Sequence, residues 1–446
     1  MTSGPASPPW LRRPSHHRWL EREGDRLLDF ARAARHPEGG FAWLDDQGQP
    51  RLEQPVELWI TARMTHAFAL GQMLGRPGDR DLVDHGIAAL AGRLRDRVNG
   101  GWYTAVDTTG PTDPSKQTYG HAFVVLAASS ATAAGHPLAP QLLRDALQIM
   151  DTHLWSHTDA MVVDTYDQRF TDLSPYRGVN ANMHTVEAFL AASDVTGDPQ
   201  WRDRALQICE RVLNQHAPHS SWRLVEHFDD TWTPLPDYNI DQPADPFRPY
   251  GATVGHALEW SRLALHLRAA LGPTAPPWLL TAATALFDQA ITDGWATDGQ
   301  PGFIYTTDWD GKPVIRHRMH WVAAEATATA ASLHRATGEQ RFAALYEQWW
   351  DHIDQTMRDP IGGSWWHELD QTNHPSAQVW SGKPDIYHAL QATLIPRLPL
   401  TPTLATALHH GLLEDQLLED QQSPPRTGRR LNAPHRARLR RREQTS

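Results

Sequence analysis

The chain has 446 residues, with 41 Lys and Arg against 52 Asp and Glu, and a formal net charge of −11 at pH 7. Its length allows one large domain or two ordinary ones, and no apolar run approaches the roughly 20 residues that span a bilayer, which excludes an integral membrane protein. Eight Arg and one Glu fall in residues 421–446, which leaves a net charge of −18 on residues 1–420, and so acidic a body argues against a nucleic-acid partner.

Ala-rich amphipathic periodicity recurs along the whole chain and predicts an all-α protein. The expected helices lie at 17–35, 58–74, 79–98, 117–134, 138–156, 180–196, 198–215, 253–271, 275–293, 319–337, 338–358 and 385–395. Short breaks that contain Gly, Pro or Asp join many of them, as is typical of antiparallel neighbours. The twelve helices therefore predict six helical hairpins.

Every second predicted helix begins with a similar phrase that contains a histidine. These residues are His66, His121, His184, His256, His320 and His388, separated by 55, 63, 72, 64 and 68 residues. Spacing this regular indicates a repeated unit of about 65 residues. Six such units closed into a ring predict an (α/α)6 barrel in which one helix of each pair faces inward.

A second recurring feature is a Gly or Ser turn followed by aromatic residues. It occurs at 39–43, 100–103, 220–222, 302–305 and 362–366. These phrases predict short β-hairpins in the loops on the pocket side, ahead of the next inner helix.

The two ends of the chain are expected to lie outside the barrel. We predict a flexible segment at 1–15, a single catalytic domain at 16–420, and a disordered Arg-rich tail at 421–446. The Pro- and Ser-rich start has no apolar stretch typical of a signal peptide, and the lone Cys209 fits a reducing compartment. A cytoplasmic protein is therefore expected.

A closed ring of this kind gathers the starts of the inner helices around one mouth. The polar and aromatic residues collected there are Arg63, Tyr119, His121, Asn180, His184, His256, Glu259, Trp321, Glu325 and His388. Residues that are scattered over the sequence would thus form one pocket.

Three kinds of chemistry fit such a pocket. The sequence has His317-x-x-His320 but no established metal motif, so it requires no metal. Glu187, Glu259 and Glu325 could provide the paired carboxylates of a glycoside hydrolase. Histidine suits removal of a proton from the carbon next to a carbonyl, and a nearby Arg could stabilise the enediolate that results.

A structural role remains the alternative for each aligned histidine, namely a residue at a helix start that bonds to neighbouring backbone. His66, His121 and His320 are the ones for which we favour this interpretation. The functional hypothesis therefore depends on which of the six are chosen.

Three phrases resemble the N-acylglucosamine 2-epimerase superfamily, in particular its aldose–ketose isomerase branch of mannose and sulfoquinovose isomerases. They are Gly255-His256-Ala-Leu-Glu259-Trp260, Asn180-Ala-Asn-Met-His184-Thr-Val-Glu187 and Ser381-Gly-Lys-Pro-Asp-Ile-Tyr-His388-Ala-Leu-Gln391. The resemblance extends from about residue 43 to 400. It implies an (α/α)6 barrel and sugar isomerisation through a cis-enediolate, with neither metal nor cofactor.

The resemblance also implies roles for single residues. His388 would move the proton between C2 and C1, and His256 would assist ring opening. Substrate binding would fall to Arg63, Tyr119, Asn180, His184, Arg248, Glu259, Trp321 and Glu325.

The expected reaction interconverts D-mannose and D-fructose, with D-lyxose and D-xylulose as a further pair. A sugar 2-epimerase shares the same intermediate and is the first alternative; a glycoside hydrolase and a non-catalytic sugar-binding module are the others. The sequence assigns no oligomeric state.

Overall fold

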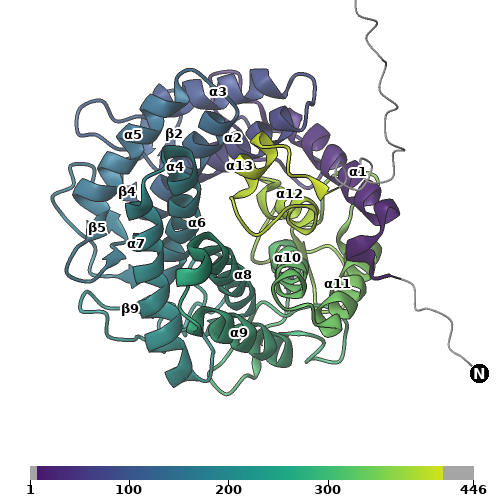
Figure 1. Ribbon diagram of the computed structural model, residues 1–446. Coiled ribbons are helices and arrows are strands. Elements are labelled where there is room, and N and C mark those ends of the chain that lie inside the picture. Colours follow the sequence, from purple (N-terminus) through teal and green to yellow (C-terminus); the bar gives the residue numbers. More distant parts are fainter. Residues whose placement is uncertain (1–7, 415–446) are drawn as a thin grey trace, which may run out of the picture.

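The computed structural model describes residues 8–414 and has two concentric rings of helices (Figure 1). The inner ring contains α2 (Leu58–Met73), α4 (Thr118–Ala133), α6 (Val179–Thr196), α8 (Val254–Leu271), α10 (His320–Thr337) and α12 (Tyr387–Leu394). The outer ring contains α1 (Pro14–Ala31), α3 (Asp79–Ala91), α5 (Ala139–Ile149), α7 (Pro199–Cys209), α9 (Trp278–Gly294) and α11 (Gln340–His352). Each inner helix packs against the next, and α12 packs against both α2 and α1. The predicted (α/α)6 barrel is confirmed.

The inner helices are buried around most of their circumference, which their composition explains. In α2 every residue from Leu58 to Gly71 is buried, and in α10 a run rich in alanine, Ala323–Ala331, lies in the core. A helix that is covered on all sides needs no polar face, and small side chains let neighbouring backbones approach closely. The outer helices keep a solvent-facing side.

The helix ends differ from the expected ranges at several points. α3 ends at Ala91, seven residues before the end expected at residue 98. α1 begins at Pro14 and follows a short 3-10 helix, η1 (Trp10–Arg12), so helical residues begin within the segment 1–15. Three outer helices end in π-helical turns, η3 (Met150–Leu154), η4 (Glu210–His216) and η7 (Ile353–Met357). Hydrophobic periodicity does not distinguish such turns from the α-helix that they extend.

Further helical turns are η2 (Arg32–Ala34), η5 (Ala217–Ser220), η6 (Gly272–Thr274) and η8 (Ile395–Arg397). An additional helix, α13 (Leu404–His409), packs against α2, α4 and α6 and was not expected from the sequence. The Arg-rich tail expected at 421–446 lies outside the described residues.

Short antiparallel strands lie in the loops between the helices. They are β1 (Val56–Glu57), β2 (Ala105–Val106), β3 (Pro111–Asp113), β4 (Lys116–Gln117), β5 (Trp155–Ser156), β6 (Met161–Val162), β7 (Thr165–Tyr166), β8 (Arg177–Gly178), β9 (His227–Phe228), β10 (Ala252–Thr253), β11 (Thr306–Thr307), β12 (Pro313–Ile315), β13 (Arg318–Met319) and β14 (Glu368–Leu369). They pair as β1-β2-β3, β10-β11-β12, β4-β7, β5-β6, β8-β9 and β13-β14.

The aromatic phrases that predicted hairpins form smaller structures. Phe41, Trp102, Phe303 and Trp365 each make a single bridge to a residue one to four positions past the end of the preceding helical segment. All four side chains are buried, so these phrases anchor the loops, and the regular strands come a few residues later. The phrase at 220–222 forms a turn without a strand.

The ring is closed by contacts between its first and last units. Glu23 on α1 accepts hydrogen bonds from Arg26 Nε and Arg358 Nε, both at 2.9 Å, and from Trp365 Nε1 at 2.7 Å. The carboxylate is buried, so its two cationic partners compensate a charge withdrawn from water. In residues 8–414 no helix is both long and apolar enough to cross a membrane.

Candidate active site

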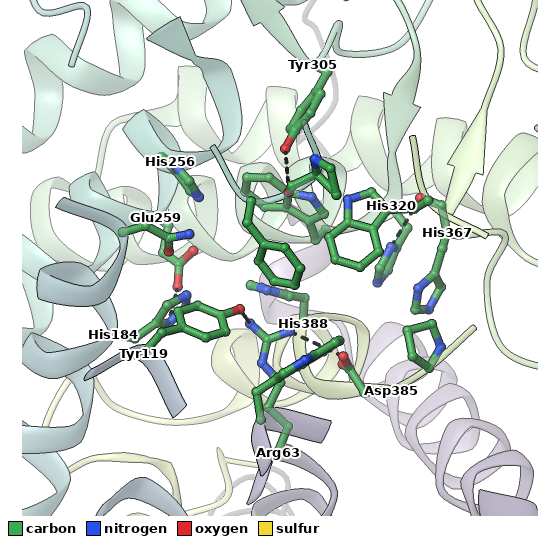
Figure 2. A pocket seen from close by; sticks show the side chains of 17 residues that line it. Arg63, Tyr119, His184, His256, Glu259, Tyr305, His320, His367, Asp385 and His388 are labelled. Atoms are coloured by element: carbon green, nitrogen blue, oxygen red, sulfur yellow. Dashed lines mark hydrogen bonds and ion pairs between the residues drawn. The ribbon is translucent and has the colours of Figure 1, made fainter. Parts of the chain in front are cut away.

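A cavity with an empty volume of about 620 Å³, including its open mouth, lies at the starts of the inner helices (Figure 2). Its walls are formed by Trp59, Arg63, Tyr119, Asn180, His184, Pro246, Phe247, His256, Glu259, Tyr305, His320, Trp321, His367, Trp380, Pro384, Asp385 and His388. The contributing residues of α2, α4, α6, α8, α10 and α12 fall in the first two turns of each helix. The ring therefore brings together side chains that are 329 residues apart in the sequence.

Eight of the ten residues expected to act in catalysis or binding line this cavity, and Arg248 and Glu325 do not. Arg248 turns away to form an ion pair with Asp164 at 2.8 Å, while its neighbours Pro246 and Phe247 reach the wall. The carboxylate of Asp164 thus holds the guanidinium of Arg248 outside the cavity wall. Glu325 lies behind the wall.

His388 is paired with Glu325. Its Nδ1 donates to Glu325 Oε1 over 2.9 Å, which leaves the other ring nitrogen as the basic one. Burial, together with the positive charge of Arg63, holds the pKa of His388 well below its usual range. The imidazole is therefore a neutral, oriented base at neutral pH.

His256 has the same arrangement with a different acid. Its Nδ1 donates to Glu226 Oε2 over 2.7 Å, and both side chains are buried. Burial alone would raise the pKa of Glu226, but the neighbouring His256 lowers it below its ordinary value. Glu226 was not predicted as a site residue, because it lies in a loop just before β9 and no repeated phrase marks it.

A third group of residues surrounds the guanidinium of Arg63. Its Nη2 donates to Tyr119 Oη at 2.8 Å and its Nη1 to Asp385 Oδ2 at 3.2 Å. The rings of Phe123 and Tyr387 lie 4.3 and 4.7 Å from its Cζ. A fixed cation thus faces the cavity next to His388, where it can stabilise an oxyanion without rearrangement. Asp385 belongs to the phrase that ends in His388, but it was not recognised as a site residue.

Below the wall, three carboxylates gather around Arg262. Arg262 bonds to Glu325 and Glu259, while Glu187 accepts hydrogen bonds from Tyr387 Oη and Gln391 Nε2. Burial and the proximity of Glu325 raise the pKa of Glu259 well above its ordinary value.

Burial lowers the pKa of His184, which faces these acids from the cavity wall, to about 4. Two triads, His184 with Glu187 and Glu259, and Glu259 with Glu325 and His388, come close enough to hold a cation. Arg262 already provides a positive charge to two of these acids, so the chain itself compensates the negative charge of the acid cluster.

Aromatic rings form the remaining walls. The centroid of the Trp321 indole lies 5.1 Å from the ring of His256 and 5.7 Å from that of His388. At the mouth, Trp380 packs against Phe247 and Trp59. Apolar faces of this kind suit the C–H faces of a sugar ring.

His320 lies at a helix start and makes the backbone contact expected of it, with Nδ1 3.4 Å from the carbonyl oxygen of His367, and it also lines the cavity. It is stacked on His367 with 3.7 Å between the ring centroids, and Figure 2 shows the pair opposite His256. Burial lowers the pKa of His320 to about 4. His66 and His121 do not line the cavity: His66 Nδ1 bonds to Ser130 Oγ, and His121 bonds to the backbone of Trp102 and Gln117.

Comparisons with known proteins agree with this fold. The family model described as N-acylglucosamine 2-epimerase (GlcNAc 2-epimerase) matches residues 39–392. A D-mannose isomerase from Pseudomonas cannabina pv. alisalensis is 52% identical over 90% of this chain and 97% of its own length. A second D-mannose isomerase, from Thermobifida fusca, is 51% identical over 90% of this chain and 98% of its own.

Solved structures show the same architecture. A crystal structure of a D-mannose isomerase superposes with a TM-score of 0.80 at 30% identity, covering 85% of this chain and 97% of that one. A cellobiose 2-epimerase from Spirochaeta thermophila gives a TM-score of 0.75 at 21% identity over 90% of this chain and 98% of its own, a likeness of fold alone. With the match to the family model and the relatives above half identity, the chain belongs to the N-acylglucosamine 2-epimerase family.

Proposed function

We propose that the protein is an aldose–ketose isomerase that interconverts D-mannose and D-fructose, and that D-lyxose and D-xylulose are a second pair. The observation that carries the proposal is the placement of two imidazoles, His256 and His388, each bonded through Nδ1 to a buried carboxylate and each close to the indole of Trp321. The close relatives named D-mannose isomerase support the choice of sugar.

The chemistry follows from the two pairs. His256 exchanges the ring-opening proton at oxygen, which gives the open-chain aldehyde. The free nitrogen of His388 removes the C2 proton, and the electron pair of that C–H bond forms the C1–C2 double bond while the carbonyl electrons move to O1. The same imidazole returns the proton to C1, and His256 carries the hydroxyl proton from O2 to O1, so that C2 becomes the carbonyl carbon.

Arg63 faces the oxygens on which negative charge develops, and its guanidinium stays protonated throughout. Tyr119, Asn180, His184 and Glu259 are positioned to hold hydroxyl groups, and the Trp321 indole packs against the sugar. Glu325 acts indirectly, by orienting His388. Arg248 also acts indirectly, by fixing the loop that supplies Phe247.

The chemistry of the donor set supports a metal-free reaction, because Arg63 provides at the oxygens the charge that a metal ion would. The relatives named D-mannose isomerase support a monosaccharide as the substrate. The single, buried Cys209 supports a reducing, cytoplasmic location.

The test is product identification by NMR after incubation of the protein with mannose and a chelator. Fructose is expected, with solvent deuterium incorporated when the reaction runs in D₂O. His388→Ala should abolish this exchange while circular dichroism shows an intact fold, and Arg341→Ala on the surface is the control that retains it.

Four outcomes would contradict the proposal. Glucose as the main product would identify a 2-epimerase, and activity that returns only with a divalent ion would identify a metal enzyme. Binding of sugar without deuterium exchange would indicate a non-catalytic module. Release of a reducing end from an oligosaccharide, lost in Glu259→Gln, would indicate a hydrolase.

A further inference from the structure

Beneath the cavity, one buried guanidinium connects the acids that stand behind two cavity histidines. Arg262 lies on α8 and is 2% exposed. Its Nε donates to Glu325 Oε2 at 2.7 Å and its Nη2 to Glu325 Oε1 at 3.2 Å, so the contact is bidentate. The same Nη2 lies 3.5 Å from Glu259 Oε1.

Each of these acids also faces a histidine. Glu325 Oε1, which Arg262 contacts, is the atom that accepts the hydrogen bond of His388 Nδ1. Glu259 Oε1 lies 3.7 Å from His184 Nδ1. Arg262 itself does not line the reaction cavity; it lines a smaller space deeper in the barrel, between the inner helices and α13. It therefore acts on the site only through other side chains.

We propose that Arg262 is a positioning residue that fixes Glu325 against His388 and sets the lower pH limit at which His388 serves as a base. This inference rests on the isomerase function proposed above. Glu325 shares its negative charge between a permanent cation and the imidazole, and without Arg262 the imidazole would be its only partner. The imidazolium–carboxylate form would then be favoured, and His388 would take up a proton at higher pH.

Other charged groups around His388 would stay in place when Arg262 is removed. The facing groups are Arg63 on α2, His184 on α6, Glu259 on α8, His320 and Glu325 on α10, and Asp385 ahead of α12. Arg63 and Asp385 are paired with each other, and the two histidines are neutral at neutral pH because burial lowers their pKa values to about 4. Loss of Arg262 thus removes one positive charge from a group whose other members do not compensate for it.

The first experiment measures kcat for mannose against pH in the wild type and in Arg262→Gln and Arg262→Lys. In Arg262→Gln the acidic limb of the kcat–pH profile should move to higher pH by about one unit or more. This is the size of shift expected when one unit charge is removed close to the titrating group. KM should change less than kcat, since Arg262 does not reach the substrate. Arg262→Lys keeps the charge but loses the bidentate geometry, so it should show a smaller shift in the same direction and partial recovery of kcat.

Arg223→Gln provides the matched control. Arg223 also makes a bidentate contact, with Asp293 at 2.7 and 3.0 Å, but it lies outside the cavity wall. Its loss should lower the melting temperature and leave the acidic limb unmoved. If Arg262 had only a structural role, Arg262→Gln and Arg262→Lys would behave like Arg223→Gln, with a lower melting temperature and an unchanged acidic limb.

A second experiment does not depend on turnover. Titration of ¹⁵N-labelled histidines by NMR, without sugar, follows His388 directly in each folded variant, assigned through its absence from His388→Ala. An upward shift of the His388 titration in Arg262→Gln, or in Arg262→Lys if only that variant folds, supports the proposal. An unmoved titration in every folded variant overturns it. If the wild type makes no fructose, the proposed function fails, whereas the titration still decides the role of Arg262.

Discussion

At the scale of single residues, the hydrogen-bond partner of each aligned histidine distinguishes the histidines proposed for catalysis from those with a structural role. Only His256 and His388 among the six place Nδ1 within hydrogen-bond distance of a carboxylate in the described chain. His66 bonds to a hydroxyl and His121 to backbone. The acids that distinguish the first two lie 30 and 63 residues away, so the repeated phrases mark only the set of six, and the choice of His256 and His388 as catalytic comes from the family resemblance.

His66 is expected to make stability depend on pH. Burial lowers its pKa from 6.5 to about 4. Between these values the unfolded chain binds a proton that the folded chain does not, so the free energy of unfolding falls as pH drops from about 6.5 to 4, by up to about 3 kcal/mol for this residue. Urea unfolding of the wild type and His66→Gln at several pH values checks this. The difference between them should narrow toward pH 4, and a constant difference would contradict a neutral His66.

Glu226 should matter for turnover more than for binding. Its carboxylate orients His256 without lining the cavity, so Glu226→Gln leaves the shape of the wall intact but weakens the bond that fixes the imidazole. We expect kcat to fall by about tenfold to a hundredfold with KM nearly unchanged, as for carboxylates that orient other functional histidines. Steady-state kinetics with mannose measures both constants. A rise in KM alone would indicate that Glu226 contacts the sugar.

At the scale of elements, the approach of α8 to α10 depends on a glycine. A Cβ added to Gly255 would lie 2.3 Å from Trp321 Cζ3 and 2.7 Å from Val322 Cγ2. Since helix backbones yield little, Gly255→Ala should push the indole of Trp321 toward the cavity, raise KM for mannose and lower stability by about 1 to 3 kcal/mol.

Gly197→Ala is the control for this change. Gly197 has φ of +70° and nothing within 4 Å of an added Cβ, so alanine there strains the backbone but disturbs no neighbour. Stability should fall by about 1 kcal/mol while KM stays constant. Equal KM values in all three proteins would show that Trp321 does not form the sugar-binding wall.

Much of the element order could be predicted, because Gly, Pro and Asp breaks and the repeated histidine phrases mark where helices begin and end in the sequence. The inner helices match their expected ranges to within three residues at either end. Periodicity failed where it carries no information: η3, η4 and η7 continue the pattern of the helices before them, and α13 is shorter than two turns. Arg248 shows the same limit within the site, since a motif places a residue in a loop but not the carboxylate that captures it.

At the scale of the whole molecule, Glu23 carries much of the contact that closes the ring. Replacing it by alanine would leave Arg26 and Arg358 without their shared acceptor and remove the partner of Trp365 Nε1. Breaking a buried ion pair on one side costs about 3 to 5 kcal/mol. Chemical denaturation of Glu23→Ala measures this loss. The exposed pair of Asp288 and Arg341 is the control, and Asp288→Ala should cost less than about 1 kcal/mol.

A closed circle of repeats also unfolds differently from a linear array. In a solenoid the outermost repeats have one neighbour and fray first. Here the contact of α1 with α12 gives every unit two neighbours, so no unit is terminal. Amide exchange should therefore be similarly slow in the six inner helices, and weakening the Glu23 contact should accelerate it first in α1 and α12, where the circle would open.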